Sequence, residues 1–392
     1  MSQPITLNPW PSFSEEEANR ASEILLSNKV NYWTGQEGRE FEKEFALFTD
    51  SEYAIAVSNG TTAIDLALNA LEIGEGDEVI VTSRTFIASI SSIVNAGAKP
   101  IFADVDRDTQ NITAETIASV ITDTTKAIIC VHLAGWPCEM DEIIALAEIH
   151  DLKVIEDCAQ AHGSKYKGCS VGSIGHIGAW SFCQDKIMTT GGEGGMVTTN
   201  DKALWSRMWS FKDHGKSFDA IYYRDHPPGF RWVHESFGTN WRLTEMQSAI
   251  GRIQITRMKD WTQIRGEHAA KLVHVCREFK CIRIPKIPDY IQHANYKFYV
   301  FIELENLNEG CSRDSIIEAL NAKGVPAMQG SCSEVYLEKA FDNTGFRPAE
   351  SLPVAKQLGE TSMMFQVHPT ITAEQMDQVC ECLRYVLQQA SH

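Results

Sequence analysis

Residues 53–82, YAIAVSNGTTAIDLALNALEIGEGDEVIVT, decide the fold class of this chain. Tyr53–Val57 and Glu78–Thr82 are short runs dominated by Val, Ile and Ala, which is typical of buried strands. Between them, Thr61–Leu71 repeats apolar residues at steps of three and four, which predicts a helix. A strand, a helix and a second strand in this order indicate an α/β domain around a mostly parallel sheet.

The same alternation continues along the first two thirds of the chain. Met140–His150 has the apolar spacing of a helix. Further buried strands are predicted at Lys99–Ala103, Ala127–Val131, Lys153–Glu156, Gly178–Phe182 and Gly195–Thr198. Only a short Gly-rich segment separates the last two strands, so we expect this part of the sheet to be antiparallel.

The pattern changes from about Asn240, which indicates a second and smaller α+β domain. A long helix is predicted at Leu243–Thr256, continuing with interruptions towards Phe279. It is followed by a strong strand, Tyr296–Leu304, and by helices at Ser312–Lys323 and Thr372–Gln388. We therefore predict a large domain over residues 1–255, including an N-terminal segment, and a small C-terminal domain over 256–392.

Composition excludes several classes of protein. The 392 residues carry 35 Lys and Arg against 52 Asp and Glu, a formal net charge of −17, which disfavours binding to nucleic acid or to an anionic membrane. No apolar run approaches the roughly 18–20 residues of a membrane span. The 11 cysteines show neither zinc-site nor disulfide-framework spacing, so we expect no metal and a reducing, cytoplasmic location.

A carboxylate follows the strand Lys153–Glu156 in the stretch IEDCAQAHG, residues 155–163. Ligands of open α/β sheets bind beyond the carboxyl ends of the strands, where Asp157 is predicted to lie. A buried carboxylate there needs a cationic or hydrogen-bonding partner, such as a protonated ring nitrogen. The alternative is that Asp157 caps the N-terminus of a helix.

A lysine follows the next strand, in SFCQDK, residues 181–186, and precedes the glycine-rich TTGGEGG, residues 189–195. A desolvated amine is a nucleophile towards carbonyl groups, and glycines permit close approach of the backbone to a ligand. The alternative is a surface lysine before an ordinary turn. No GxGxxG motif follows the first strand, so a nicotinamide-binding fold is not supported.

Two further motifs stand where helices are predicted to begin. VSNGTTA, residues 57–63, offers backbone N–H groups and hydroxyls that bind anions, or simply a helix cap. GTNWRL, residues 238–243, places Asn240 and Arg242 just before the long helix, either as ligands or as a cap and a solvated charge. A carboxylate, a lysine, an anion cradle and the aromatic Phe86 are together the groups that pyridoxal phosphate requires.

The order of these motifs resembles the DegT/DnrJ/EryC1/StrS sugar aminotransferases. Further matching positions are Thr34-Gly35, Thr85-Phe86, His132–Gly135 and His368-Pro369, so the resemblance covers nearly the whole chain. It implies the aspartate aminotransferase fold, fold type I, with a large domain around a mostly parallel seven-stranded sheet and a smaller α+β C-terminal domain. It also implies pyridoxal 5'-phosphate as cofactor.

The resemblance assigns a role to each matching residue. Lys186 would bond to the cofactor and later move the proton, Asp157 would keep the pyridine nitrogen protonated, Gln160 would bind the ring hydroxyl and Phe86 would stack on the ring. Gly60, Thr61, Thr62 and Ser181 would bind the phosphate. Asn240 would reach the phosphate of the neighbouring subunit, which implies a homodimer. Arg242 would meet the carboxylate of the amino donor, and Thr34 would contact substrate.

The resemblance also predicts the reaction, which is transfer of an amine from glutamate to a nucleotide-linked keto sugar, leaving 2-oxoglutarate. The segment 330–341, GSCSEVYLEKAF, resembles a subgroup of surface-polysaccharide pathways, such as those of O-antigen in lipopolysaccharide. It favours C-4 of UDP-2-acetamido-2,6-dideoxy-4-keto-hexose. Because a pyrophosphate needs cations, at least one of the candidates Lys29, Lys216 and Arg231 is predicted to contact it, although a solvated surface charge is the favoured interpretation of each one taken singly.

Other reactions and roles remain open from the sequence. Within the family, the alternatives are C-3 amination of a dTDP- or UDP-linked 3-keto sugar and amination of a GDP-linked 4-keto-6-deoxy sugar. Sugar 3-dehydratases of this fold typically carry His in place of the lysine, so Lys186 argues against that reaction. A non-catalytic sensor that keeps the fold is disfavoured by the intact set of Lys186, Asp157 and Gln160.

Overall fold

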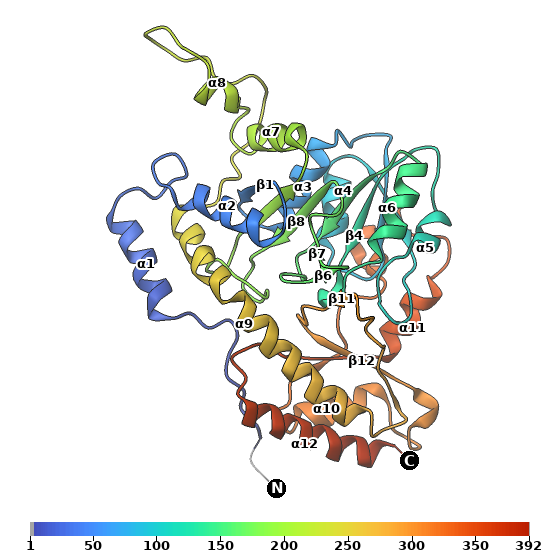
Figure 1. Cartoon of the computed structure of the whole chain (residues 1–392). Helices are drawn as coiled ribbons and strands as arrows, with labels where there is room; N and C mark the ends of the chain where they lie inside the picture. The colour runs from blue at the N-terminus through green and yellow to red at the C-terminus, as the bar shows by residue number, and fades with distance from the viewer. Residues whose placement is uncertain (1–3, 392) are drawn as a thin grey trace.

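Two units, joined by one long helix, make up the chain in a computed structural model that describes residues 4–391 (Figure 1). The larger unit is built on a seven-stranded sheet in the order β1-β9-β8-β5-β4-β2-β3. Its strands are β1 Tyr53–Val57, β2 Glu78–Thr82, β3 Lys99–Ala103, β4 Thr125–Val131, β5 Lys153–Asp157, β8 Ile177–Ser181 and β9 Gly195–Thr199. All seven predicted strands are confirmed.

Six of the seven strands run in one direction, and β9 runs against them. β9 pairs antiparallel with both β1 and β8, whereas β5 pairs parallel with β4 and β8. The predicted antiparallel part of the sheet is therefore confirmed. This arrangement brings the carboxyl ends of the parallel strands and the amino end of β9 to one edge.

Helices cover both faces of this sheet, because residues of each strand alternate between two sets of apolar contacts. In β1, Ile55 and Val57 face the core under α3, α4 and α7, while Ala54 and Ala56 face α2 and α9. The remaining strands of that second face are covered by α5, α6 and α11. These helices are α2 Glu37–Phe48, α3 Gly60–Ala70, α4 Ala88–Asn95, α5 Ala114–Ala118, α6 Met140–Ile149, α7 Lys202–Phe211, α9 Glu245–Cys276 and α11 Pro353–Thr361.

The smaller unit is an antiparallel sheet of four strands in the order β10-β12-β14-β13, packed against helices. The strands are β10 Ile282–Arg283, β12 Phe298–Ile302, β13 Ala327–Met328 and β14 Ser362–Phe365, and the helices are α10 Arg313–Asn321 and α12 Ala373–Ala390. Ile5 and Leu7, from the start of the chain, pack against the same core. The predicted strand and both predicted helices of this region are confirmed.

Three short elements and two outer helices complete the fold. β6 Lys165–Tyr166, β7 Cys169–Ser170 and β11 Ile291–Gln292 form a small sheet in the order β11-β6-β7. α1 Glu15–Leu26 packs on α9, and α8 Phe218–Tyr222 lies on a segment that projects from the body of the molecule (Figure 1). Within residues 4–391, no helix has the length and apolar character needed to cross a bilayer.

The helix α9 differs from the sequence-based expectation because it is continuous over 32 residues. The expected interruptions are absent from it, although Gly251 and Gly266 lie inside. A Cβ at Gly251 would stand 2.5 Å from Cζ of Phe41, so the glycine permits α2 to approach closely. This packing outweighs the cost of about 1 kcal/mol for glycine in a helix. The proposed division at residues 255 and 256 falls inside α9 and stays a prediction.

Candidate active site

The candidate site lies at the sheet edge where β1, β5 and β8 end and β9 begins. Gly195, the first residue of β9, pairs with the last residues of two strands, Val57 and Ser181. Asp157, the last residue of β5, pairs with Ala179 of β8. The topology therefore collects motifs from distant parts of the sequence, from the start of α3 at Gly60 to the start of β9 at Gly195.

Asp157 is held in place as a buried carboxylate. It is 6% exposed, and Oδ2 accepts a 2.8 Å hydrogen bond from the Ser89 hydroxyl. Oδ1 accepts a 3.1 Å hydrogen bond from the N–H of Ala159. The residues that follow form turns and no helix, so the alternative interpretation of Asp157 as a helix cap is wrong. Ser89 lies in α4, just after Phe86, whose ring is 70% exposed at the same edge.

Glu156, immediately before Asp157, is the centre of a fully buried network. Its two oxygens accept hydrogen bonds from the N–H groups of Gly172, Ile174 and Gly175 and from Nε2 of His132 at 2.9 Å. Nδ1 of His132 accepts from the N–H of Cys138, so Nε2 carries the proton. His132, Glu156 and Cys158 lie close enough to hold a metal ion, but these hydrogen bonds already occupy the carboxylate. The network instead fixes the end of β5.

Gln160 is oriented from the neighbouring turn. Its Oε1 accepts a 2.8 Å hydrogen bond from the N–H of Ala134. The backbone of Ala134 also accepts from the N–H of Tyr296, and Gly135 accepts from Ala294. This turn therefore links the site to the segment that precedes β12.

The start of α3 presents backbone N–H groups that no other residue accepts from in the described part of the chain. The Asn59 side chain accepts from the N–H of Thr62 at 2.9 Å, and Thr62 Oγ1 accepts from the N–H of Asn59 at 3.2 Å, so the predicted cap is confirmed. The N–H groups of Gly60 and Thr61 have no acceptor among residues 4–391. A Cβ at Gly60 would stand 2.6 Å from Cβ of Ser181, which places the two free N–H groups beside the Ser181 hydroxyl.

Lys186 lies in the loop between β8 and β9 and is 18% exposed. Its carbonyl oxygen accepts from the indole Nε1 of Trp10 at 2.9 Å, which anchors the backbone. Its Nζ lies 3.9 Å from Oδ1 of Asp185 and 5.4 Å from the centroid of the Tyr296 ring. The alternative interpretation as a freely solvated lysine does not describe this environment.

Positive charge dominates the surroundings of Lys186. Burial lowers the pKa of Lys297 to about 8, and the charges of Arg265 and Lys186 contribute in the same direction. Burial and the same two cations lower the pKa of His162 to about 3. The pKa of Asp185 lies below its ordinary value, because the Lys186 charge and the hydrogen bond from the Tyr296 hydroxyl outweigh the effect of its desolvation.

A second group of predicted residues gathers around the buried carboxylate of Asp213. Its Oδ1 accepts from Arg242 at 2.5 Å and from Lys216 at 3.0 Å, and Oδ2 accepts from the indole of Trp33 at 2.6 Å. Lys216 also stands 4.3 Å above the Trp33 ring, so it is not a solvated surface charge. Thr34 is the neighbour of Trp33 and is exposed.

The remaining predicted residues lie on the surface. Lys29 and Asn240 are exposed, and the backbone of Asn240 forms a bridge with Asp213. Arg231 donates to the carbonyl oxygen of Ile221 at 2.8 Å, and therefore supports the end of α8. None of these three has a hydrogen bond or an ion pair to the sheet-edge residues within the described part of the chain.

Comparison with known proteins identifies the family. The sequence matches the DegT/DnrJ/EryC1/StrS aminotransferase family over residues 11–384. This chain belongs to that family. Two curated relatives are 35% identical: GDP-perosamine synthase of Escherichia coli O157:H7, over 95% of this chain and 96% of the relative, and UDP-N-acetyl-3-dehydro-alpha-D-glucosamine 3-aminotransferase of Acidithiobacillus ferrooxidans, over 92% of each.

Solved structures share the whole fold. An aminotransferase from Psychrobacter cryohalolentis is 62% identical, with a TM-score of 0.97 over 98% of this chain and 99% of that chain. The PMP form of the sugar aminotransferase Spr1654 from Streptococcus pneumoniae is 25% identical, with a TM-score of 0.86 over 98% of this chain and 99% of that chain. Fold type I, implied by the resemblance, is confirmed by this likeness to aminotransferases of that fold.

The residues at the sheet edge fit a phosphorylated pyridine ring, the cofactor type of this aminotransferase family. Two free N–H groups and the Thr61 and Ser181 hydroxyls suit the phosphate. The exposed Phe86 ring offers a face for stacking, and the Asp157 carboxylate offers a partner for a ring N–H.

Sequence reasoning missed the groups that hold these residues in place. Ser89 acts on Asp157 across 68 residues, and Tyr296 donates to Asp185 across 111 residues. Both interactions depend on tertiary contact, so no local pattern predicts them. The sequence offered one signal for these interactions, which is the acidic residue Asp185 directly before Lys186, the expected nucleophile.

Proposed function

We propose that this chain is a pyridoxal-phosphate-dependent aminotransferase that transfers the amine of glutamate to a nucleotide-linked keto sugar. The observation that carries the proposal is the single sheet edge that presents Lys186, the buried Asp157 and the free N–H groups of α3. Membership of the aminotransferase family supports it, as do relatives named for GDP- and UDP-linked sugars. When bound, the cofactor supplies an electrophilic carbonyl and a ring that withdraws electrons.

Lys186 would bond to the cofactor and move the proton. Its side chain is 18% exposed and its Nζ lies 5.4 Å from the centroid of the Tyr296 ring, so the amine is held at the sheet edge, where it can act as a nucleophile towards a carbonyl group. The Asp185 carboxylate at 3.9 Å provides a nearby negative charge. In this proposal the Lys186 amine carries a proton between the substrate carbon and the cofactor carbon on one face.

Asp157 and Gln160 set the electronic state of the ring. The Asp157 carboxylate hydrogen bonds to the protonated ring nitrogen, and Ser89 keeps the carboxylate oriented. The Ala134 N–H holds Oε1 of Gln160, so the Gln160 NH2 group is available for the ring hydroxyl. Phe86 covers one ring face, and Gly60, Thr61, Thr62 and Ser181 hold the phosphate.

A homodimer completes the site in this proposal. The segment around α8 exposes large apolar side chains, with Tyr223 77%, Phe230 74%, Trp232 79% and Phe237 99% exposed. Exposed aromatic clusters of this kind mark protein interfaces. Asn240 follows this segment directly, so a second copy that covers the segment would bring Asn240 to its neighbour's phosphate cradle.

The preferred substrate is UDP-2-acetamido-2,6-dideoxy-4-keto-hexose, aminated at C-4 for surface polysaccharide. The resemblance of residues 330–341 to that subgroup supports it. In this proposal Arg242 meets the carboxylate of the donor, and Thr34, Lys29, Lys216 and Arg231 lie towards the nucleotide. Arg242 and Lys216 are already bound to Asp213, so substrate anions would compete with that carboxylate.

Two other substrates have a specific observation in their favour. The Acidithiobacillus relative is named as a 3-aminotransferase of a UDP-linked sugar, and the Escherichia relative is named for a GDP-linked sugar. A 3-keto sugar linked to UDP or dTDP and a GDP-linked 4-keto-6-deoxy sugar are therefore the alternatives. The cytoplasm is the proposed location, since all 11 cysteines are free thiols in the structure.

The decisive experiment is an amination screen read by mass spectrometry. The purified enzyme, loaded with pyridoxal phosphate, is incubated with glutamate and each of the three keto-sugar classes. We expect the product mass only with the UDP-linked 4-keto-6-deoxy-N-acetylhexosamine. Amination of a 3-keto or GDP-linked sugar alone would keep the aminotransferase proposal and overturn the substrate. No amination of any of them would contradict the proposed function.

A further inference from the structure

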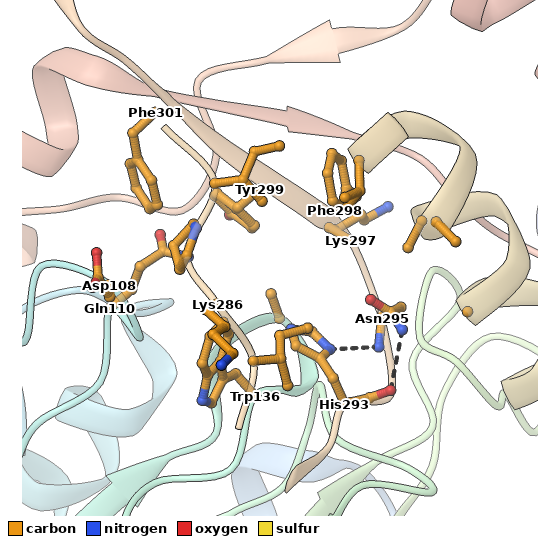
Figure 2. Close-up of a pocket in the computed structure, with 18 of the residues that line it drawn as sticks. Asp108, Gln110, Trp136, Lys286, His293, Asn295, Lys297, Phe298, Tyr299 and Phe301 are labelled. Carbon is orange, nitrogen blue, oxygen red and sulfur yellow. Dashed lines mark hydrogen bonds between the residues drawn. The ribbon is translucent and has the colours of Figure 1, made fainter. Parts of the chain in front are cut away.

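A cavity of about 610 Å³ lies between the two units of the chain. Its walls come from the second half of α9, from the segment that leads into β12, and from the loops that contain Gln110 and Trp136 (Figure 2). The volume is within the usual range for small-molecule sites, about 300–1,000 Å³. Lys186, Asp157, Phe86 and Ser181 are not among its lining residues, so it lies beside the sheet-edge site, and Lys297 is a lining residue on which the charges of Lys186 and Asp185 act.

The wall contains a buried polar group without a partner. Trp136 is only 7% exposed, and its indole Nε1 has no hydrogen-bond acceptor among residues 4–391. Its ring packs against His293 at 5.5 Å between centroids. The Nε1 atom has almost no accessible surface, so the wall offers a ligand the indole ring and not its N–H group.

Three cations of the lining have no carboxylate within ion-pair distance in the described part of the chain. They are Arg277 and Lys286, which are exposed, and the largely buried Lys297. Of the nearby acidic groups, Asp108 contacts Arg283 and Glu278 binds Arg384 at 2.8 Å, while the charge of Asp185 acts on Lys297 without an ion pair. Three cations without an ion pair around one cavity attract an anion.

The rest of the lining is mostly apolar and aromatic. Tyr299 and Phe301 stand on one side and Trp136 on the other, with Val273 and Ile284 completing the wall. Such a surface suits a planar organic body rather than a bare inorganic ion. A small dicarboxylate would leave much of the 610 Å³ unfilled.

We propose that this cavity binds a nucleoside phosphate, with its base among the aromatic side chains and its phosphate at the cationic mouth formed by Arg277 and Lys286. This inference does not rest on the proposed function, because it concerns a site outside the substrate cleft. The cavity wall includes Ala134, which orients Gln160, and it adjoins Tyr296, which binds Asp185. A nucleotide in the cavity therefore restrains Ala134 and Tyr296, and through them Gln160 and Asp185 at the sheet edge. In this way the bound nucleotide acts as an effector.

The test counts UDP sites by calorimetry on the full-length, cofactor-loaded enzyme. The wild type is compared with Arg277→Ala/Lys286→Ala and with the control Lys259→Ala/Lys280→Ala, whose residues are exposed and lie outside the lining. We expect two UDP sites per chain in the wild type and the control. In the pocket variant we expect one of them to weaken by about tenfold or more, which corresponds to about 1.4 kcal/mol, with KM for the keto sugar unchanged.

The number of UDP sites and their response to the pocket variant decide whether the cavity binds a nucleotide. If the wild type has a single UDP site per chain and Arg277→Ala/Lys286→Ala leaves its affinity unchanged, the inference is overturned. If the wild type has a single UDP site and the pocket variant weakens it, the inference is supported, but UDP is then not the nucleotide part of the substrate. If 2-oxoglutarate or inorganic phosphate binds the cavity and UDP does not, the assignment to a nucleoside phosphate is wrong.

Discussion

The hydroxyl of Tyr296 donates a 2.5 Å hydrogen bond to Oδ2 of Asp185, whose other oxygen lies 3.9 Å from Nζ of Lys186. The segment before β12 thereby fixes the one carboxylate that flanks the lysine. The orientation of this carboxylate therefore depends on a residue of the C-terminal part of the chain.

Tyr296→Phe should move the acidic limb of the pH profile. Asp185 has a pKa below its ordinary value, partly because it accepts this hydrogen bond. Loss of the bond raises that pKa, so protonation of Asp185 begins at a higher pH. Because the Asp185 side chain is 60% exposed, the shift should be at most about one pH unit. The measurement is kcat/KM against pH.

The control for that variant is Tyr290→Phe, which removes an exposed hydroxyl bound to Glu139 at 3.1 Å. It should leave the profile unchanged. An identical acidic limb in Tyr296→Phe and the wild type would show that Asp185 does not influence the reacting amine.

Lys186 should carry the cofactor covalently. The purified enzyme should be yellow, and borohydride followed by peptide mapping should find the reduced adduct on Lys186. Lys186→Ala should lose both the adduct and turnover. Lys297, the other partly buried lysine of this region, is the matched comparison: an adduct on Lys297 would refute the assignment.

Asp157→Asn should retain the cofactor and lose most of the rate. The amide can still accept from Ser89, but it carries no charge to keep the ring nitrogen protonated. We expect kcat to fall by at least about a hundredfold, or about 2.7 kcal/mol in activation free energy. Absorbance measures cofactor binding separately from turnover. Near-normal kcat would remove Asp157 from the chemistry.

Mixed dimers should recover activity if Asn240 serves the neighbouring subunit. Lys186→Ala and Asn240→Ala are each expected to be nearly inactive. In a mixed dimer, one of the two sites receives both intact residues, so mixing should restore up to about a quarter of wild-type activity when subunits exchange at random. Subunit exchange is verified by mass spectrometry of differently tagged chains. If exchange occurs without recovery, the two residues act within one chain.

Glu156→Gln should destabilise the fold, and most strongly at neutral pH. Burial acts to raise the pKa of Glu156, but hydrogen bonds from His132, Gly172 and Gly175 bring it below the ordinary 4.5. The unfolded chain therefore binds the proton more tightly, so this stabilisation is present above pH 4.5 and is lost as the pH falls through the folded-state pKa. We expect a loss of about 3 kcal/mol at pH 7.

Urea unfolding at pH 7 and at pH 4 measures this effect. The difference between Glu156→Gln and the wild type should shrink at the lower pH. Glu23→Gln, which alters a surface carboxylate paired with Arg20, should change little at either pH. An equal loss of stability for both variants at pH 7 would show that the Glu156 network is not stabilising.

The sequence predicted the strands well because each is a short apolar run between polar turns. Lys153 and Tyr53 begin strands where predicted, and β9 runs antiparallel as the short connection required. The long helix was harder, because interruptions were expected beyond Thr256, where Gly266 weakens the local signal, yet α9 runs unbroken to Cys276. Local patterns contain no information about the tertiary packing that stabilises such a helix.

In the candidate site, too, the sequence predicts the position of some residues but not the partners that hold them. Motifs that follow strands, such as Asp157 and the start of α3, could be placed from sequence because parallel strands end at one edge. The partners of these residues could not. Asp213, which binds Arg242 and Lys216, shows no local pattern that distinguishes it from other carboxylates. Its importance emerges only when the distant Trp33 and Arg242 converge on it together with the nearby Lys216.

The uninterrupted α9 also affects how this enzyme can move. At 1.5 Å per residue, its 32 residues form a rod of about 48 Å. The first half of α9 packs Met258 into the core beside the sheet, and the last turns pack Leu272 and Cys276 into the core of the smaller unit. A hinge within α9 would break helical hydrogen bonds, so we expect the two units not to bend about this helix. For the same reason, neither unit could be excised without leaving a bare apolar stripe, and separately expressed halves should aggregate.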